Sequence, residues 1–264
     1  MSPAGSVPGW SIRPLRSLAE YEACVALQRA TWGDDFRELV PPALLQVTQK
    51  IGGIVAGAFV EDRMIGFVFG LTGVRDGALA HWSHMLAVEA AYRDHGLGRA
   101  LKRYQRDQLV AAGCTRMYWT FDPLVARNAW LNLHHLGARV VEYVRDMYGN
   151  TSRSRTDTVI GSDRFVVRWD LEGARDRAIE GSRDRGTEGA LITTEADPLP
   201  DAGVVRVAVP ADIQALKAQD PATARGWRAS TRRAFEHYLA RGYTVADVER
   251  GDGNAVIYRL EREP

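Results

Sequence analysis

The sequence predicts an α/β protein built on a mixed, mainly antiparallel sheet with helices on both faces, plus a smaller C-terminal α/β extension. Two apolar segments, 54–60 and 64–74, are separated by a short polar turn, which is typical of an antiparallel β-hairpin. An amphipathic helix at 97–112 lies between two apolar strands, which is typical of the crossover that joins parallel strands. Residues 199–264 again show strand, helix and hairpin signals, which indicates a second α/β part.

Local signals place the other elements along the chain. Pro41 and Pro42 open a helix at 43–50, because proline is tolerated in a first helical turn. Gly113 closes the helix at 97–112, since glycine readily adopts the left-handed conformation that follows helix ends. The same reasoning predicts helices at 18–30, 211–218 and 220–242, and strands at 11–14, 79–89, 115–121, 140–144, 164–170, 204–209, 243–249 and 255–260.

Asp122 and Pro123 follow the strand at 115–121 and predict the start of another helix. An aspartate in this place accepts hydrogen bonds from the first helical N–H groups, and proline fits the first helical position. Gly137 marks the end of that helix.

A charged, glycine-bearing and aperiodic stretch at 171–198 predicts a loop or linker. We therefore expect a main domain at 1–170, this linker, and an α/β extension at 199–264.

Charge and cysteine usage exclude several classes of protein. The 264 residues carry 34 basic and 33 acidic side chains, so no overall field attracts nucleic acid. Cys24 and Cys114 are too few for a disulfide framework and lack zinc spacing, so no metal is expected. The longest apolar stretch, 64–74, is too short to span a bilayer, and residues 1–14 lack the apolar core of a signal peptide. We expect a cytoplasmic protein with no nucleic-acid or membrane partner.

The segment at 93–99 carries the clearest chemical signal, because a tight glycine turn there follows a strand and opens a helix. Gly96 and Gly98 lack a Cβ atom, so a ligand can approach the backbone closely. The first N–H groups of the helix have no internal partner and carry the positive end of its dipole, which suits a pyrophosphate. Arg93 adds a cation that can fork onto phosphate oxygens. The third glycine of the dinucleotide-binding pattern is missing. An ordinary strand–turn–helix that needs glycine only for its shape is the alternative.

The pattern Arg93-x-x-Gly96-x-Gly98, preceded by Leu-Ala-Val at 86–88, resembles the acyl-CoA motif of the GNAT acetyltransferases over about residues 10–150. The resemblance implies a GNAT-type fold, acetyl-CoA or another acyl-CoA as co-substrate, and transfer of the acyl group to an amine. It implies that strand residues bond the pantetheine arm and that the turn holds the pyrophosphate. Carried over to this chain, the first set is Leu86, Ala87 and Val88, and the second is Arg93, Gly96, Leu97, Gly98 and Arg99.

A narrower resemblance links the chain to one GNAT branch that has a C-terminal extension. Some members of that branch are linked to N-succinyl amino acid metabolism, so the resemblance implies succinyl transfer to an amino acid amine. The matching segments are 83–88, 119–124, 127–129, 136–138 and 148–150, with 163–167 and 217–221 towards the extension.

One position departs from the family pattern. Many members have a tyrosine four residues before the glycine that ends the helix, where it protonates the leaving thiolate. Leu133 occupies that position in this chain. Tyr143, Tyr148 or His134 are the candidates to replace the acid, and solvent is the remaining alternative.

His84 is the candidate general base. Strand alternation puts it on the same face as Trp82, and a histidine can take a proton from an amine near neutral pH. A hydrogen-bonded structural histidine is the alternative. His81 points to the other face and is expected to be peripheral, so the two histidines do not form a metal pair.

Several polar residues near the motif have both a structural and a functional interpretation. Asp122 caps the predicted helix or orients the substrate ammonium. Asn128 lies four residues before Asn132 on one helix face and binds the pantetheine or the substrate, unless it is structural. Arg127 clamps a carboxylate or is a solvated surface arginine. Lys102 belongs to a solvated helix face, unless it reaches the nucleotide phosphates.

The combined prediction is an N-acyltransferase whose domain spans 1–170 and whose amine acceptor is a small molecule. The amine attacks the thioester directly in a ternary complex, with His84, Asp122 and Tyr148 as catalytic candidates. Backbone N–H groups near Leu86 stabilise the oxyanion. A non-catalytic CoA sensor and an interaction module are the alternatives. The extension completes a homodimer or covers the acceptor site.

Overall fold

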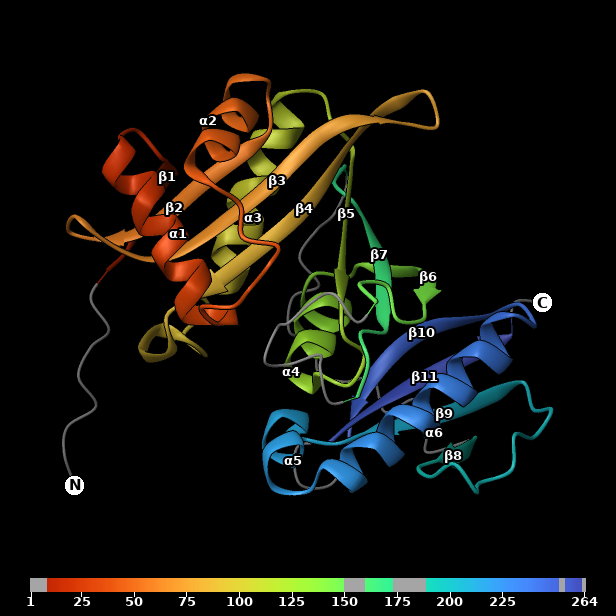
Figure 1. Cartoon of the computed structure of the whole chain (residues 1–264). Coiled ribbons are helices and arrows are strands. Elements are labelled where there is room, and N and C mark those ends of the chain that lie inside the picture. The colour runs from red at the N-terminus through yellow and green to blue at the C-terminus, as the bar shows by residue number, and fades with distance from the viewer. Residues whose placement is uncertain (1–8, 150–159, 173–188, 252–254, 263–264) are drawn as a thin grey trace. The chain divides into compact units, whose positions relative to one another are not determined.

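The computed structural model describes residues 9–149, 160–172, 189–251 and 255–262 (Figure 1). The chain forms two compact units, one of residues 1–119 with 170–172 and the other of residues 120–169 with 173–264. Residues 120–169 therefore group with the C-terminal part of the chain. The predicted domain boundaries at 170 and 199 stay a prediction.

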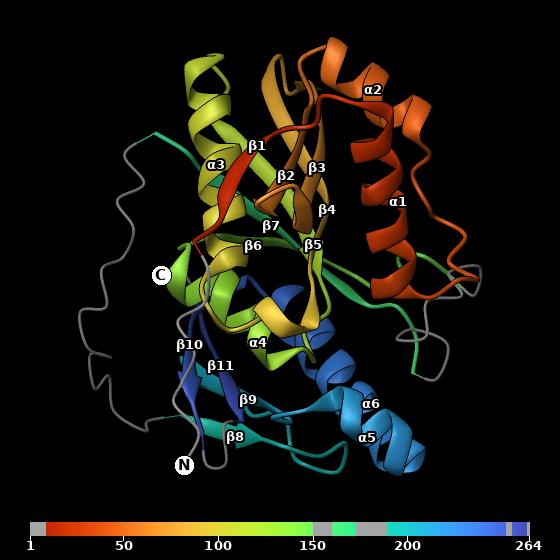
Figure 2. The same cartoon turned by 90° about the vertical axis from the view of Figure 1, so that its left-hand side faces the viewer.

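The first unit contains a sheet in the order β1-β2-β3-β4-β5. Neighbouring strands are antiparallel except for β4 and β5, which pair in parallel. Figure 2 shows α3 on one face of this sheet and α1 with α2 on the other. The predicted mixed, mainly antiparallel sheet with helices on both faces is confirmed. The strands are β1 (Ser11–Pro14), β2 (Ile54–Val60), β3 (Arg63–Arg75), β4 (Ala78–Val88) and β5 (Arg116–Phe121), and the helices are α1 (Leu18–Trp32), α2 (Pro42–Lys50), the short η1 (Ala90–Tyr92) and α3 (Leu97–Ala111).

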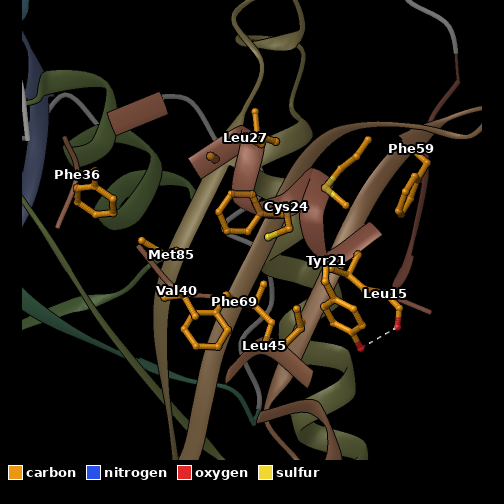
Figure 3. Packing of buried hydrophobic residues seen from close by; sticks show 14 residues of the cluster. Leu15, Tyr21, Cys24, Leu27, Phe36, Val40, Leu45, Phe59, Phe69 and Met85 are labelled. Carbon is orange, nitrogen blue, oxygen red and sulfur yellow. Dashed lines mark hydrogen bonds between the residues drawn. The ribbon is translucent and has the colours of Figure 1, made fainter. Parts of the chain in front are cut away.

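An apolar core lies between this sheet and α1 (Figure 3). Tyr21, Cys24 and Leu27 recur at helical spacing on α1, so they share one face and pack against the sheet. Phe69 and Met85 meet them from β3 and β4. Burial raises the pKa of the Cys24 thiol to about 12, so this cysteine is not a nucleophile at neutral pH.

The second unit contains the antiparallel pair β6–β7 and a smaller sheet in the order β10-β11-β9-β8, so the predicted second α/β part is confirmed. Phe165, Phe235 and Tyr258 form its aromatic centre, with ring centroids 4.7 to 5.6 Å apart. The strands are β6 (Arg139–Val144), β7 (Arg164–Asp170), β8 (Ala190–Ile192), β9 (Val204–Val209), β10 (Tyr243–Arg250) and β11 (Val256–Arg262), and the helices are α4 (Ala126–Ala129), its π-helical continuation η2 (Trp130–His135), α5 (Ile213–Gln219) and α6 (Pro221–Leu239).

Two predictions about these elements are wrong. The helix expected from Asp122 begins at Ala126, because the Asp122 carboxylate caps a turn instead and accepts from the Leu124 N–H at 2.9 Å. The loop expected at 171–198 contains the strand β8, whose three residues are too short for a periodic signal. The part of that loop at 173–188 lies outside the described residues.

A cluster of buried charges joins α6 to β6 and β7 within the second unit. Asp163 has no exposed surface and accepts hydrogen bonds from Arg232 Nε at 2.8 Å and from the Tyr143 hydroxyl. Arg228 donates to the second carboxylate oxygen of Asp122 at 2.7 Å. Burial opposes the ionisation of Asp163, but the hydrogen bonds from Arg232 and Tyr143 outweigh it and hold the pKa below its ordinary value.

Replacing Asp163 by Asn should lower the free energy of unfolding by about 3–5 kcal/mol, because it leaves the buried Arg228 and the half-buried Arg232 with less compensating charge. Chemical denaturation at neutral pH measures the loss. Asp76→Asn is the matched control, since Asp76 lies exposed in the β3–β4 turn and asparagine accepts its positive φ of 54°. An equal loss in both variants would contradict a stabilising role for the cluster.

Candidate functional site

The strands β4 and β5 separate soon after they meet. Their parallel ladder consists of His81 with Met117 and Trp82 with Tyr118. Beyond Trp82, β4 continues to Val88 and pairs with β3 alone among the described residues. Strand pairing therefore leaves N–H and C=O groups along one edge of β4 available to an extended ligand. We call the point where β4 and β5 part the fork.

A β-bulge lies at the fork. The register between β3 and β4 shifts so that Met85 pairs with Phe69 and Ser83 with Gly70, which leaves His84 without a partner. Bulges of this kind re-aim a side chain. The exposed His84 ring lies edge-on to Phe69, with centroids 5.9 Å apart. Loss of hydration to the surrounding protein lowers the pKa of His84, so the ring is neutral near pH 7 and able to accept a proton.

The helix α3 presents an open N-terminus directly after β4 and η1. Its N-cap is Gly96, in the left-handed conformation with φ of 83°, and no side chain caps the helix. The first helical hydrogen bond runs from Ala100 N to Gly96 O at 3.0 Å, so the N–H groups of 97–99 precede it. A Cβ atom on Gly96 would meet nothing within 4 Å, which shows open space in front of the helix. This combination suits a phosphate group.

Arg93 is exposed at the end of η1. Its Nε donates to the carbonyl oxygen of Val88 at 3.0 Å, which ties the cation to the last residue of β4. The predicted cradle residues at 93–99 thus lie on one turn that continues from the free edge of β4.

Beneath the fork, a chain of buried polar side chains joins α3 to the sheet. Lys102 Nζ donates to Ser83 Oγ at 2.7 Å, and Ser83 donates to Gln105 Oε1 at 2.8 Å. Gln105 Nε2 lies 3.0 Å from His81 Nε2, and His81 Nδ1 lies 2.9 Å from Thr72 Oγ1. His81 is therefore an internal member of this chain rather than a peripheral residue.

The predicted solvated position of Lys102 is wrong, because only 4% of the residue is exposed. Burial lowers the pKa of its ammonium to about 7. Burial and the charge of Lys102 lower the pKa of His81 to about 3, so His81 is neutral. Gln105 can then donate to His81 Nε2 while His81 Nδ1 donates to Thr72. The spacing of apolar residues along α3 could have indicated this burial. The leucines at 97, 101 and 109 define the buried face of the helix, and Lys102 lies at the edge of that face.

The other predicted site residues belong to the second unit. Asp122 uses one carboxylate oxygen for the turn cap and the other for Arg228, so its charge is already compensated. The Tyr148 hydroxyl lies 3.0 Å from Thr120 Oγ1. Asn128 is half-buried on α4, whereas Asn132 is buried in η2. Their roles toward a ligand stay predictions.

The candidates for the missing acid differ in their surroundings. Leu133 is buried in η2. Tyr143 donates its hydroxyl to Asp163, and burial with that carboxylate raises its pKa well above the ordinary range, so it is a poor proton donor. His134 stacks on Trp130 with centroids 3.9 Å apart.

A forked strand that leads into an uncapped, glycine-started helix is the geometry expected for the motif at 86–99. Residues 21–137 match the model of the acetyltransferase (GNAT) family. Residues 21–137 are therefore a GNAT acetyltransferase domain. This domain runs from α1 to the end of η2 and contains both the fork and the cradle. GNAT enzymes use acyl-CoA as co-substrate and act on amines, so residues 21–137 form a domain of the N-acyltransferase type.

The chain is also similar to proteins of known structure. The structure of yncA from Salmonella typhimurium, determined with its cofactor acetyl-CoA, is 18% identical and has a TM-score of 0.50, covering 64% of this chain and 99% of yncA. An N-acetyltransferase from Staphylococcus aureus Mu50 is 12% identical with a TM-score of 0.49, covering 62% and 99%. Among curated proteins, none matches the chain.

The described residues contain no helix with the length and apolar character needed to cross a membrane. Within the same part of the chain, no group of three His, Cys, Asp or Glu side chains is placed to hold a metal ion.

Replacing Lys102 by Met should change how stability depends on pH. An unfolded lysine titrates near 10.4, so between pH 7 and that value the unfolded wild type binds one more proton than the folded protein. Its free energy of unfolding then rises by up to about 1.4 kcal/mol per pH unit, a gain that the Met variant lacks. Urea unfolding at pH 6, 7, 8 and 9 measures the difference. Lys50→Met, on the exposed end of α2, is the control. Parallel curves for wild type and Lys102→Met would contradict the burial of a titrating amine.

Proposed function

We propose that this GNAT domain transfers an acyl group, acetyl or succinyl, from acyl-CoA to the amine of a small molecule. The observation that carries the proposal is the open N-terminus of α3, which directly follows the unpaired edge of β4. A pyrophosphate bound at Gly96 and a pantetheine arm bound along β4 would place the thioester towards the fork. An amino acid is the proposed acceptor, which rests on the narrower sequence resemblance.

The reaction proposed is direct attack in a ternary complex. The amine nitrogen bonds to the thioester carbon, the carbon–sulfur bond breaks, and the electron pair leaves on sulfur. His84 is exposed at the bulge and neutral near pH 7, so it can take the proton that the nitrogen loses. Backbone N–H groups near Leu86 lie on the same strand and would stabilise the oxyanion. Both cysteines are buried, which disfavours a covalent acyl-enzyme.

Gly96→Ala should weaken CoA binding by about tenfold or more, since the new Cβ occupies the space in front of α3 and strains a left-handed residue. Gly113→Ala is the matched control. Gly113 lies at the other end of α3 with a φ of 75° and equally open surroundings, so it shares the strain but not the cradle. Thermal unfolding with CoA, acetyl-CoA and succinyl-CoA measures binding. At 100 times its Kd, a ligand stabilises by about 2.7 kcal/mol. Equal shifts in the two variants, or none in wild type, would reject the cradle.

His84→Ala should retain the thermal shift with CoA and lose about 10²-fold or more in kcat, because the general base is removed while the cradle is untouched. Release of CoA thiol from acetyl-CoA or succinyl-CoA, in the presence of an amino acid panel, measures turnover. His237→Ala, on α6, serves as the control for loss of a histidine. An unchanged kcat would remove His84 from the mechanism.

A further inference from the structure

The apex of the fork is occupied by one charged group. The last pair of the β4–β5 ladder is Trp82 with Tyr118, so Ser83 and Trp119 are the first residues beyond it on the two strands. Lys102 touches both of them. Its Nζ lies 2.7 Å from Ser83 Oγ and 4.0 Å from the centroid of the Trp119 ring. The ammonium is thus wedged where β4 and β5 part.

No carboxylate neutralises this ammonium in the part of the chain that the structure describes. The helix α3 packs against β2, β3 and β4. The strand β2 has no ionisable side chain, and β3 has only arginines at its two ends, Arg63 and Arg75. From β4 the facing ionisable group is His81, which is neutral, and from β5 the contact is the Trp119 ring.

The remaining charged groups of β5 and α3 include one carboxylate, Asp107, which is 69% exposed and lies 3.9 Å from Arg106 rather than beside Lys102. β5 carries Arg116 and Tyr118, and the Tyr118 ring lies under Arg75. On α3 itself, the neighbouring charges are the arginines at 99, 103 and 106, and Arg106 donates to the carbonyl of Leu171. The field at the apex is therefore positive whenever Lys102 is protonated.

A buried amine without a counterion costs folding free energy, and such groups gather at functional sites. The polar chain through Ser83, Gln105 and His81 satisfies hydrogen bonds but supplies no opposite charge. A role in folding alone would be served as well by an apolar side chain of similar size. A negative charge that appears only during the reaction would explain the retention of the amine.

We propose that Lys102 is an electrostatic positioning residue for acyl transfer, whose ammonium stabilises the thiolate of CoA as it leaves. The inference rests on the proposed function and addresses the step for which Leu133 provides no acid. A ligand anchored at Gly96 and lying along β4 from Val88 to Ser83 covers six residues, about 17 Å of strand, and brings its far end to the apex.

The bonds, electrons and protons of this step balance without a further reactant. As the carbon–nitrogen bond forms and the carbon–sulfur bond breaks, the electron pair of the broken bond goes to sulfur. The proton lost by the amine nitrogen passes to His84 and then through solvent to the thiolate. Lys102 begins and ends the step as an ammonium, which its pKa of about 7 allows at neutral pH and below, and it acts through its field, which is strong in a site from which water is excluded.

The test is the titration of the CoA thiol while CoA is bound, followed by thiolate absorbance in the ultraviolet. With wild type, the bound thiol should titrate near neutral pH, well below free CoA in the same buffer, because the thiolate must form while Lys102, whose pKa is about 7, is still an ammonium. With Lys102→Met, it should titrate at or above the value of free CoA. Lys50→Met should match wild type. Equal titration in wild type and Lys102→Met overturns the proposal.

A second measurement needs no variant. If the bound thiol titrates below free CoA, the affinity for CoA relative to desulfo-CoA rises about tenfold for each pH unit of that difference as the pH increases past both values. A pH-independent ratio overturns the proposal even if Lys102→Met does not fold. If wild type binds CoA but the bound thiol titrates as in free CoA, the role of Lys102 is rejected and the proposed function is not. Failure of wild type to bind CoA rejects the proposed function and this inference with it.

Discussion

Backbone hydrogen bonding along β4 is the constraint on which the site depends. A strand inside a sheet normally pairs on both edges, because unpaired N–H and C=O groups are costly away from water. Here the ladder with β5 lasts for two residue pairs, and β4 then continues with one edge open. That edge leads through η1 to an uncapped helix, so backbone donors without a strand or helix partner lie both on β4 and at the start of α3.

Polar side chains lie below the same separation. Where β4 and β5 part, α3 places Lys102 and Gln105 against Ser83 and His81 of β4. The bulge at His84 shifts the register so that Ser83 faces this chain while His84 reaches the opposite, exposed side. The bulge therefore orients two adjacent residues to opposite sides: His84 is the candidate base, and Ser83 accepts a hydrogen bond from the buried ammonium of Lys102.

The sequence predicted the order of elements, the parallel crossover and the glycine turn, because each depends on local periodicity or on a residue with special backbone freedom. The position of Lys102 was not predictable from hydropathy, since a lysine at the edge of an apolar arc is usually solvated. The bulge at His84 depends on pairing with β3, which alternation along one strand does not reveal. Asp122 was expected to start a helix, but its partner Arg228 lies 106 residues away, beyond any local pattern.

Hydrogen–deuterium exchange in the presence and absence of CoA tests the role of the free β4 edge, because it measures the backbone N–H groups themselves. CoA should slow exchange in peptides covering the free edge of β4 and the start of α3, residues 83–99. Peptides from β1 and β2, which lie away from the fork, should exchange at unchanged rates. Uniform protection, or none within residues 83–99, would contradict the assignment of this path as the acyl-CoA site.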